Sequence, residues 1–278
     1  MSMKLEMLQA ARLAPNLLGE SAALVRQFVR RQQNPDGGFK NRAGESDLYY
    51  TVFGLDCLVA LQEPIDAVRL DTYLRSFGDG GDLDFVHLTC LARCWSGRTP
   101  EEIRAAILVR IESFSPTTLY EWFLACGACL DVRAPMPDSA RLLRCIRSMR
   151  SRDGACGNVP DLPLGSTTAT AAAVALLRQF NEPPPAEFGP WLLAQARPDG
   201  GFVAMPNAPM PDLLSTATAL HALASLKVPF DHIREPCLDF LDTLWTNEGG
   251  FHGHWADDHL DAEYTSYGLL ALGHLSTP

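Results

Sequence analysis

The sequence predicts an all-α protein built from about six helical hairpins. Three observations support this fold class: a glycine-containing turn recurs along the chain, a run of small and apolar residues follows each turn, and a more highly charged run precedes most of the turns. The units recur at roughly 40 to 50 residues, a period typical of stacked helical hairpins. Such repeats form either an open solenoid or a closed ring, and the period by itself does not distinguish these two.

The recurring turn is plainest in four places. It reads Asp36-Gly37-Gly38-Phe39, Asp153-Gly154-Ala155-Cys156, Asp199-Gly200-Gly201-Phe202 and Glu248-Gly249-Gly250-Phe251. A shortened copy at 79–82 marks a fifth unit, and a sixth unit at 113–132 keeps the helical pattern without the glycines. Because the units run from about residue 20 to the end of the sequence, we expect one domain over residues 1–278.

After each turn the pattern predicts a helix that opens with Asp, Ser or Thr. These residue types accept hydrogen bonds from the free N–H groups of a first helical turn. The six runs carry little charge and many Ala, Leu, Thr and Cys residues, so we expect them to form a buried inner set. Their expected positions are 47–61, 82–95, 116–130, 165–177, 211–226 and 261–275.

The helices that precede the turns carry charge on one face, which is typical of helices that pack on one side only. We expect them to form an outer set, with members at 22–33, 103–112, 140–150 and 236–244.

Composition and charge restrict the classes of partner. The chain of 278 residues is 47% hydrophobic, enough for a large core. Its net charge of −10 makes it acidic and leaves no excess of Lys and Arg to neutralise phosphates, so nucleic acid is not an expected partner. No window has the roughly 18 consecutive apolar residues that a membrane span needs. The N-terminal segment lacks the uninterrupted apolar stretch of a secretory signal, because it contains Lys4, Glu6, Arg12 and Pro15. Most cysteines lie in apolar helical runs, where free thiols act as small apolar side chains. We therefore expect a cytoplasmic location.

Three segments carry a family resemblance. Residues 33–39, 196–202 and 248–254 read Gln-Asn-Pro-Asp-Gly-Gly-Phe, Ala-Arg-Pro-Asp-Gly-Gly-Phe and Glu-Gly-Gly-Phe-His-Gly-His. They resemble the repeat of protein prenyltransferase β subunits and of squalene and terpene cyclases, over the chain from about residue 22 onward. The resemblance implies an α/α toroid, that is, an α6/α6 barrel of six hairpins around a central cavity. It also implies an isoprenoid or other apolar small molecule as ligand, and a helical α-type subunit as a candidate partner.

The chain departs from the zinc-dependent members of this family. Those members bind zinc through an Asp-x-Cys on the fifth inner helix and a His on the sixth, and the matching positions here are Asp212, Leu214 and Tyr264. One ligand of three is retained, so the sequence favours no zinc and no other cofactor. The loop that supplies the basic residues for a prenyl diphosphate matches 203–211, which has none. Lys40 and Arg42 in the first turn loop are the alternative anion-binding residues, and in a closed ring they would neighbour the sixth loop.

The segment Asp82-Leu83-Asp84-Phe85 resembles the Asp-x-Asp-Asp motif of class II terpene cyclases. In that motif the second Asp protonates an alkene, so the resemblance implies Asp84 as the catalytic acid and Asp82 as the neighbour that raises its pKa. The fourth position is Phe85, and helix capping is the alternative role of the pair. Those cyclases usually place the motif between two barrels, whereas this sequence predicts one.

Several aromatic, histidine and acidic side chains on the inner helices are expected to line the cavity. Aromatic rings suit a polyprenyl chain or a carbocation, although packing in a large core explains them equally well. The expected lining residues are Tyr49, Tyr50, Phe53, His87, Tyr120, Trp122, Asp212, His221, Tyr264 and Tyr267.

The leading functional hypothesis is a toroid that binds or transforms an isoprenoid, as a prenyltransferase or a class II terpene cyclase does. A second hypothesis is a non-catalytic scaffold that binds a protein partner at its acidic rim. A third is a zinc enzyme whose metal site is rebuilt from His252, His254 and Asp261.

Overall fold

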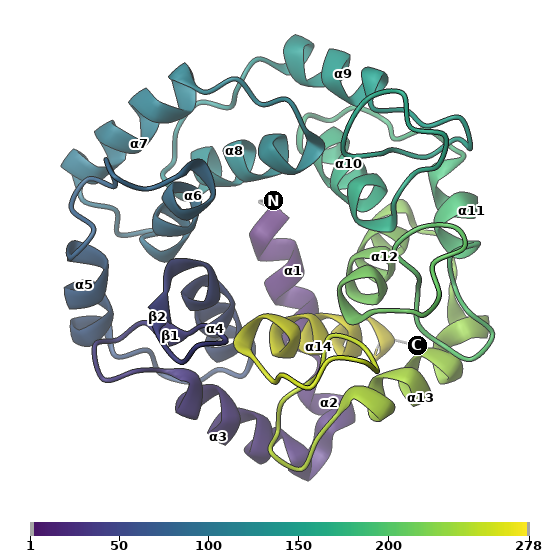
Figure 1. Ribbon diagram of the computed structural model, residues 1–278, viewed down its shortest axis with the longest axis horizontal. Helices are drawn as coiled ribbons and strands as arrows, with labels where there is room; N and C mark the ends of the chain where they lie inside the picture. Colours follow the sequence, from purple (N-terminus) through teal and green to yellow (C-terminus); the bar gives the residue numbers. More distant parts are fainter. Residues whose placement is uncertain (1–2, 277–278) are drawn as a thin grey trace.

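The computed structural model describes residues 3–276, and these residues form a closed double ring of helices (Figure 1). In the inner ring each helix packs beside the next, and the last packs against the first, so the ring closes. The α/α toroid is therefore confirmed, and closure excludes the open solenoid. The inner helices are α4 (Leu48–Ala60), α6 (Phe85–Cys94), α8 (Leu119–Asp131), α10 (Thr167–Gln179), α12 (Leu213–Leu226) and α14 (Ala262–Leu275).

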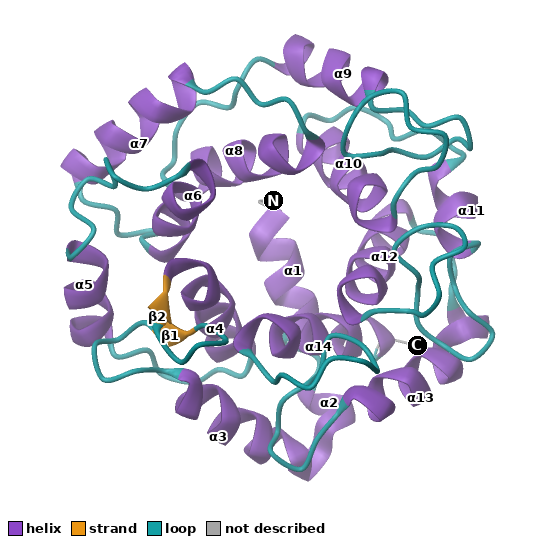
Figure 2. Ribbon diagram, viewed as in Figure 1, coloured by secondary structure: helices purple, strands orange, loops and turns teal. Residues whose placement is uncertain are grey.

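The outer ring surrounds the inner one, as Figure 2 shows. It includes α5 and α11, for which the sequence had predicted no range, and the short antiparallel pair β1 (Phe39–Lys40) and β2 (Ser46–Asp47) lies beside α4. The outer helices are α3 (Ala22–Gln32), α5 (Ala67–Arg75), α7 (Glu101–Ser113), α9 (Ser139–Ser148), α11 (Phe188–Leu193) and α13 (Arg234–Leu244). The remaining helical elements of residues 3–276 are the short helices α2 (Pro15–Leu18), η1 (Gly19–Ser21) and η2 (Asp231–Ile233), together with α1, which is described below.

Each inner helix begins at a capping side chain, as predicted. The side-chain oxygen accepts a hydrogen bond from a backbone N–H of the first turn, which satisfies donors that the helix itself leaves free. The capping residues are Asp47, Asp84, Thr118, Ser166, Asp212 and Asp261.

The glycine turns join neighbouring repeats through close backbone contacts. Gly200 has φ +98°, and a Cβ there would lie 2.0 Å from the carbonyl oxygen of Pro236 in α13. Gly249 has φ +91°, and a Cβ there would lie 2.2 Å from the carbonyl oxygen of Leu24 in α3. Since only glycine combines this backbone conformation with such an approach, the turns pack each repeat against the next outer helix. The contact of Gly249 with α3 also closes the outer ring.

The core lies between the two rings. Phe39, Phe202 and Phe251, which end three of the turns, are fully buried or nearly so. The eight cysteines are free and seven of them are buried, in agreement with their expected role as small apolar residues.

Helix α1 (Met3–Ala11) was not predicted from the sequence. It packs across α14 and α4 and is seen through the centre of the ring in Figure 1. Its backbone approaches α14 so closely that a Cβ on Gly273 would lie 2.0 Å from the carbonyl oxygen of Ala10. Helix α1 therefore covers the end of the ring at which the inner helices terminate. From residue 3 to residue 276, no helix has the length and apolar character needed to cross a membrane.

Candidate functional site

The inner ring and α1 enclose a cavity of about 480 Å³. Helix α1 contributes Met3, Lys4, Met7, Leu8 and Ala11 to its lining, and these residues form what we call the floor. The opposite end, which we call the mouth, lies at the first turns of the inner helices. The cavity is thus a cup whose base is the unpredicted N-terminal helix.

The two sides of the cavity differ in character. Tyr49 and Phe53 of α4 lie with ring centroids 5.0 Å apart, and Phe53 lies 5.5 Å from Tyr267 of α14. Tyr120 and Phe123 of α8 add two further aromatic rings. Helix α10 contributes small side chains instead, which leave the space open: Ala169, Ala171, Ala172 and Ala175.

Five of the ten expected lining residues lie in the cavity wall: Tyr49, Phe53, Tyr120, His221 and Tyr267. Trp122 is a correction, because it is 2% exposed and packs under the guanidinium of Arg141 in the outer helix α9, 5.7 Å from its ring centroid. It follows Tyr120 by two positions and so points about 200° further round the helix, away from the cavity. The remaining four also lie outside the cavity wall: Tyr50, His87, Asp212 and Tyr264.

Asp84 lies in an environment unlike the one we expected for a catalytic acid. Its carboxylate caps α6, accepting the backbone N–H of His87 at 2.8 Å, and its side chain is 65% exposed. The bond from the His87 N–H is the main reason that the pKa of Asp84 is lowered, and contacts with the His87 ring lower it further. Asp82 is exposed at the surface. The expectation that the pKa of Asp84 is raised is therefore corrected, and the catalytic role of the pair stays a prediction that this environment does not favour.

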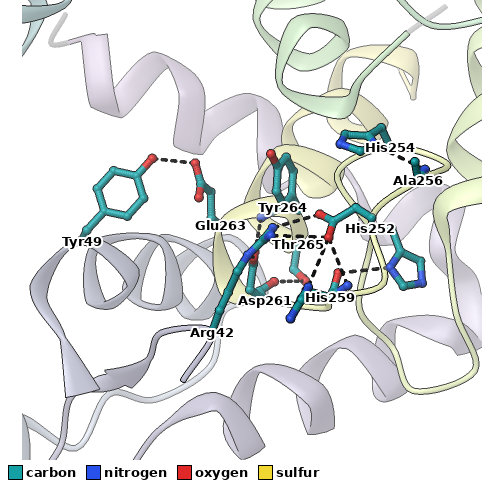
Figure 3. Close-up of polar contacts among 11 residues, drawn as sticks. Arg42, Tyr49, His252, His254, Ala256, His259, Asp261, Glu263, Tyr264 and Thr265 are labelled. Carbon is teal, nitrogen blue, oxygen red and sulfur yellow. Dashed lines mark hydrogen bonds and ion pairs between the residues drawn. The ribbon is translucent and has the colours of Figure 1, made fainter. Parts of the chain in front are cut away.

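The expected neighbourhood of the first and sixth loops is confirmed by Arg42. Its guanidinium donates to Asp257 at 2.9 Å and to Asp261 at 3.1 Å, and it lies over the ring of Tyr264 (Figure 3). Lys40 donates to the backbone oxygen of Arg31 at 2.7 Å. Two carboxylates already neutralise Arg42, which does not favour anion binding there, and the anion-binding role of Lys40 and Arg42 stays a prediction.

The histidines of the sixth loop do not gather around a common point. His252 Nδ1 lies 3.1 Å from the backbone oxygen of His259, and His254 Nδ1 accepts the N–H of Ala256 at 3.1 Å, as Figure 3 shows. Asp261 is committed to capping α14 and to Arg42. Within residues 3–276, no group of three or more His, Cys, Asp or Glu side chains is arranged to hold a metal ion.

The positions that match the family zinc site do not fit a metal either. Asp212 accepts hydrogen bonds from the backbone and hydroxyl of Ser215, and Leu214 has no ligand atom. Tyr264 packs against Arg42. We therefore derive no chemical step through zinc.

A contact between Tyr49 and Glu263 joins the first and last inner helices. The Tyr49 hydroxyl donates to Glu263 Oε1 at 2.6 Å (Figure 3). Burial raises the pKa of Glu263 to about 7, although the hydrogen bond from Tyr49 works in the opposite direction. Glu263 was not singled out from the sequence as a site residue, since its partner lies 214 positions away.

Four charged side chains lie at the floor of the cavity. Arg93 of α6 forms an ion pair with Asp56 of α4, and Lys4 donates to the backbone oxygen of Arg93 at 3.3 Å. Asp131 of α8 completes the set, and burial raises its pKa. We call Lys4, Asp56, Arg93 and Asp131 the floor cluster. None of its members was singled out from the sequence as a site residue.

His221 contacts His274 of α14, with 3.0 Å between Nδ1 and Nε2. Burial lowers the pKa of His221 to about 4 and that of His274 to about 3, so both rings are neutral near pH 7. His221 therefore lines the cavity as a neutral, hydrogen-bonded side chain.

Comparisons with known proteins agree with this architecture. The sequence profile of the prenyltransferase alpha-alpha toroid domain matches residues 3–116 and 166–275. The solved structure of the apo form of the type II terpene cyclase MstE from Scytonema is similar, with a TM-score of 0.58 and 12% identity, covering 94% of this chain and 97% of that chain. At this identity the likeness shows a shared fold. The comparison with curated proteins returned no significant match. Because the profile covers most of the sequence, the chain belongs to the prenyltransferase α/α toroid domain family.

Proposed function

We propose that this protein binds an isoprenoid in its central cavity and transforms it by proton transfer at the mouth. The observation that carries this proposal is the cavity of about 480 Å³, whose wall is mostly apolar. Burying apolar ligand surface stabilises a complex by roughly 25 cal/mol per Å², so an apolar cup of this size favours a hydrocarbon ligand.

The aromatic side of the cavity suits a positively charged intermediate. The rings of Tyr49, Phe53 and Tyr267 form a continuous cluster in the wall. The face of an aromatic ring attracts a cation through its quadrupole, by roughly 0.5 to 2 kcal/mol for each well-placed ring. A carbocation formed on the ligand would therefore be stabilised where these rings lie.

Glu263 is the proton donor in this proposal. Its pKa of about 7 leaves close to half of the molecules protonated at neutral pH, whereas Asp84 is ionised there. In the proposed step the electron pair of a ligand double bond takes the carboxyl proton, the ligand becomes a carbocation, and Glu263 becomes a carboxylate that later takes a proton back. Tyr49 positions the carboxyl through their hydrogen bond.

A single barrel is compatible with this assignment. A protein described as a type II terpene cyclase aligns with this ring of six hairpins over 97% of its own matched chain. We retain the expectations of a reducing, cytoplasmic location and of a helical partner subunit as parts of the proposal.

A bulky side chain on α10 is expected to block the cavity. Ala172 lies in the wall, so Ala172→Phe is expected to weaken binding of farnesol at least tenfold in isothermal titration calorimetry. Ala105→Phe adds the same ring to an exposed position of the outer helix α7 and should leave binding unchanged. If Ala172→Phe binds farnesol as well as the native protein does, the cavity is not the isoprenoid site, and the scaffold hypothesis is favoured.

A further inference from the structure

We propose that the ligand of this cavity carries a single carboxylate, which binds Arg93 and Lys4 at the floor while the hydrocarbon chain extends toward the mouth. This inference rests on the proposed function, because it takes the cavity as the ligand site. It adds the chemical class of the head group and the direction in which the ligand lies.

The floor cluster is the main group of charges in an otherwise mostly apolar cup. Lys4 comes from α1, Asp56 from α4, Arg93 from α6 and Asp131 from α8, and each of the four lines the cavity. Charged side chains are costly inside a protein unless they are paired. Four of them converging from four helices at the closed end of an apolar cavity indicate a place for a polar group.

The cluster has more hydrogen-bond donors than acceptors. A guanidinium has five N–H donors and an ammonium has three. Among the described residues, the Arg93 guanidinium donates to one acceptor, Asp56 Oδ2. The Lys4 ammonium likewise donates to one acceptor, the backbone oxygen of Arg93. About 23% of the Arg93 side chain is accessible, and the residue lines the cavity, so the accessible part faces the cup. A ligand oxygen at this point would receive donors that are otherwise unused.

The charge balance favours a monoanion. Lys4 and Arg93 are cations, and Asp56 is paired with Arg93. Burial raises the pKa of Asp131, while the charges of Lys4 and Arg93 lower it. Asp131 is therefore the member of the cluster that can take up a proton as an anionic head group binds, and that proton gives the cluster one net positive charge. Cys90, which also lines the cavity near Arg93, is neutral because burial raises the pKa of its thiol to about 12. One carboxylate compensates this charge, whereas a diphosphate brings more negative charge than the cluster can balance.

The mouth is a poor place for the same anion. The loop 203–211 has no basic residue, and Arg42 is held by Asp257 and Asp261. An anionic head at the mouth would meet the carboxylates of the rim, whereas at the floor it meets a guanidinium with which it can form a bidentate pair. With the head at the floor, the far end of the hydrocarbon chain reaches toward Tyr49 and Glu263, where we propose that the proton is transferred.

Three ligands that share one farnesyl chain separate the head group from the tail: farnesoic acid, methyl farnesoate and farnesol. At pH 7.5 the native protein is expected to bind the acid at least tenfold more tightly than the ester or the alcohol, and also more tightly than farnesyl diphosphate. Lys4→Met is expected to weaken binding of the acid about fivefold and to leave the ester unchanged. Lys227→Met removes the same charge from an exposed position at the end of α12, outside the cavity wall, and should change neither affinity.

A second variant tests the role of Arg93 without leaving an unpaired buried charge that could destabilise the fold. Arg93→Gln alone would leave Asp56 buried without its partner, so the test uses Asp56→Asn/Arg93→Gln, which removes both charges of the pair. This double variant is expected to bind the ester normally and to lose the preference for the acid. Equal binding of acid and ester by the native protein, or a preference that survives both Lys4→Met and the double variant, would overturn the inference while leaving the cavity as the ligand site. Failure of all three ligands to bind would instead overturn the proposed function, and this inference with it.

Discussion

Replacing Gly273 by alanine is expected to displace helix α1 from the floor of the cavity and to lower the free energy of unfolding by about 2 kcal/mol or more. The new Cβ would lie 2.0 Å from the carbonyl oxygen of Ala10, a backbone atom that cannot move without the rest of α1. Because α1 supplies Met3, Lys4 and Met7 to the cavity, its displacement should also open the floor to water. Urea unfolding measures the first effect, and hydrogen exchange of the α1 amides measures the second.

Gly127 provides a matched control for this substitution. It lies inside the inner helix α8, and a Cβ there would meet no other atom within 4 Å. Alanine has the higher helix propensity, so Gly127→Ala is expected to stabilise the protein by about 0.5 to 1 kcal/mol. The two glycine-to-alanine changes in inner helices should therefore have opposite signs. Equal stability of the two variants, with α1 amides as protected in Gly273→Ala as in the native protein, would show that α1 is not seated on α14 as described.

Replacing Glu263 by glutamine is expected to reduce turnover by a factor of about 10² to 10⁴, because the amide has no proton of suitable acidity to give. The same variant also tests the raised pKa of Glu263, because that pKa makes the free energy of unfolding depend on pH. The folded protein keeps the Glu263 proton up to about pH 7, whereas an unfolded chain releases it near the ordinary value of 4.5. The contribution of this proton to stability is therefore lost as the pH rises from about 4.5 to about 7.

Glutamine is uncharged at every pH, so Glu263→Gln should be more stable than the native protein at pH 8, by about 2 kcal/mol once partial solvent screening is allowed for. At pH 5 the difference should be clearly smaller. Glu112→Gln makes the same substitution on an exposed face of α7 and serves as the surface control. Urea unfolding of the three proteins at both pH values measures this, and parallel stability curves for Glu263→Gln and the native protein would mean that Glu263 ionises normally.

The helices and their caps were predictable because they depend on residues close in sequence. Asp212 and Asp261 cap the helices that follow them, and the N–H groups that they accept lie within three positions. The same local chemistry explains why the pKa of Asp84 is lowered and not raised as we expected. Its spacing resembles a catalytic motif, but the carboxylate is used by the backbone of its own helix, which keeps it ionised and exposed. A motif match cannot show whether a carboxylate acts as a catalytic acid or as a helix cap.

The lining of the cavity was predicted only in part, because it depends on the phase of each helix relative to the ring axis. Tyr120 and Trp122 are two positions apart and were expected to share one environment, yet one lines the cavity and the other packs beneath the outer ring. The aromatic composition of α4, α8 and α14 indicated which helices would contribute rings. It did not indicate which rings would face inward.

The sequence by itself determined the repeat, the order of inner and outer helices and the loss of the family zinc ligands and basic clamp, since each of these follows from residue identity within a few positions. Only the tertiary structure decided that the ring closes, that α1 forms its floor and that Tyr49 contacts Glu263. It also decided that Arg93 pairs with Asp56 and lines the same cavity as Lys4 and Asp131. These contacts join helices that are far apart in sequence, and the pKa shifts depend on burial that exists only after they have packed together. The proposed chemistry therefore depends on residues that the folded repeats bring together, but that the repeat pattern in the sequence does not identify.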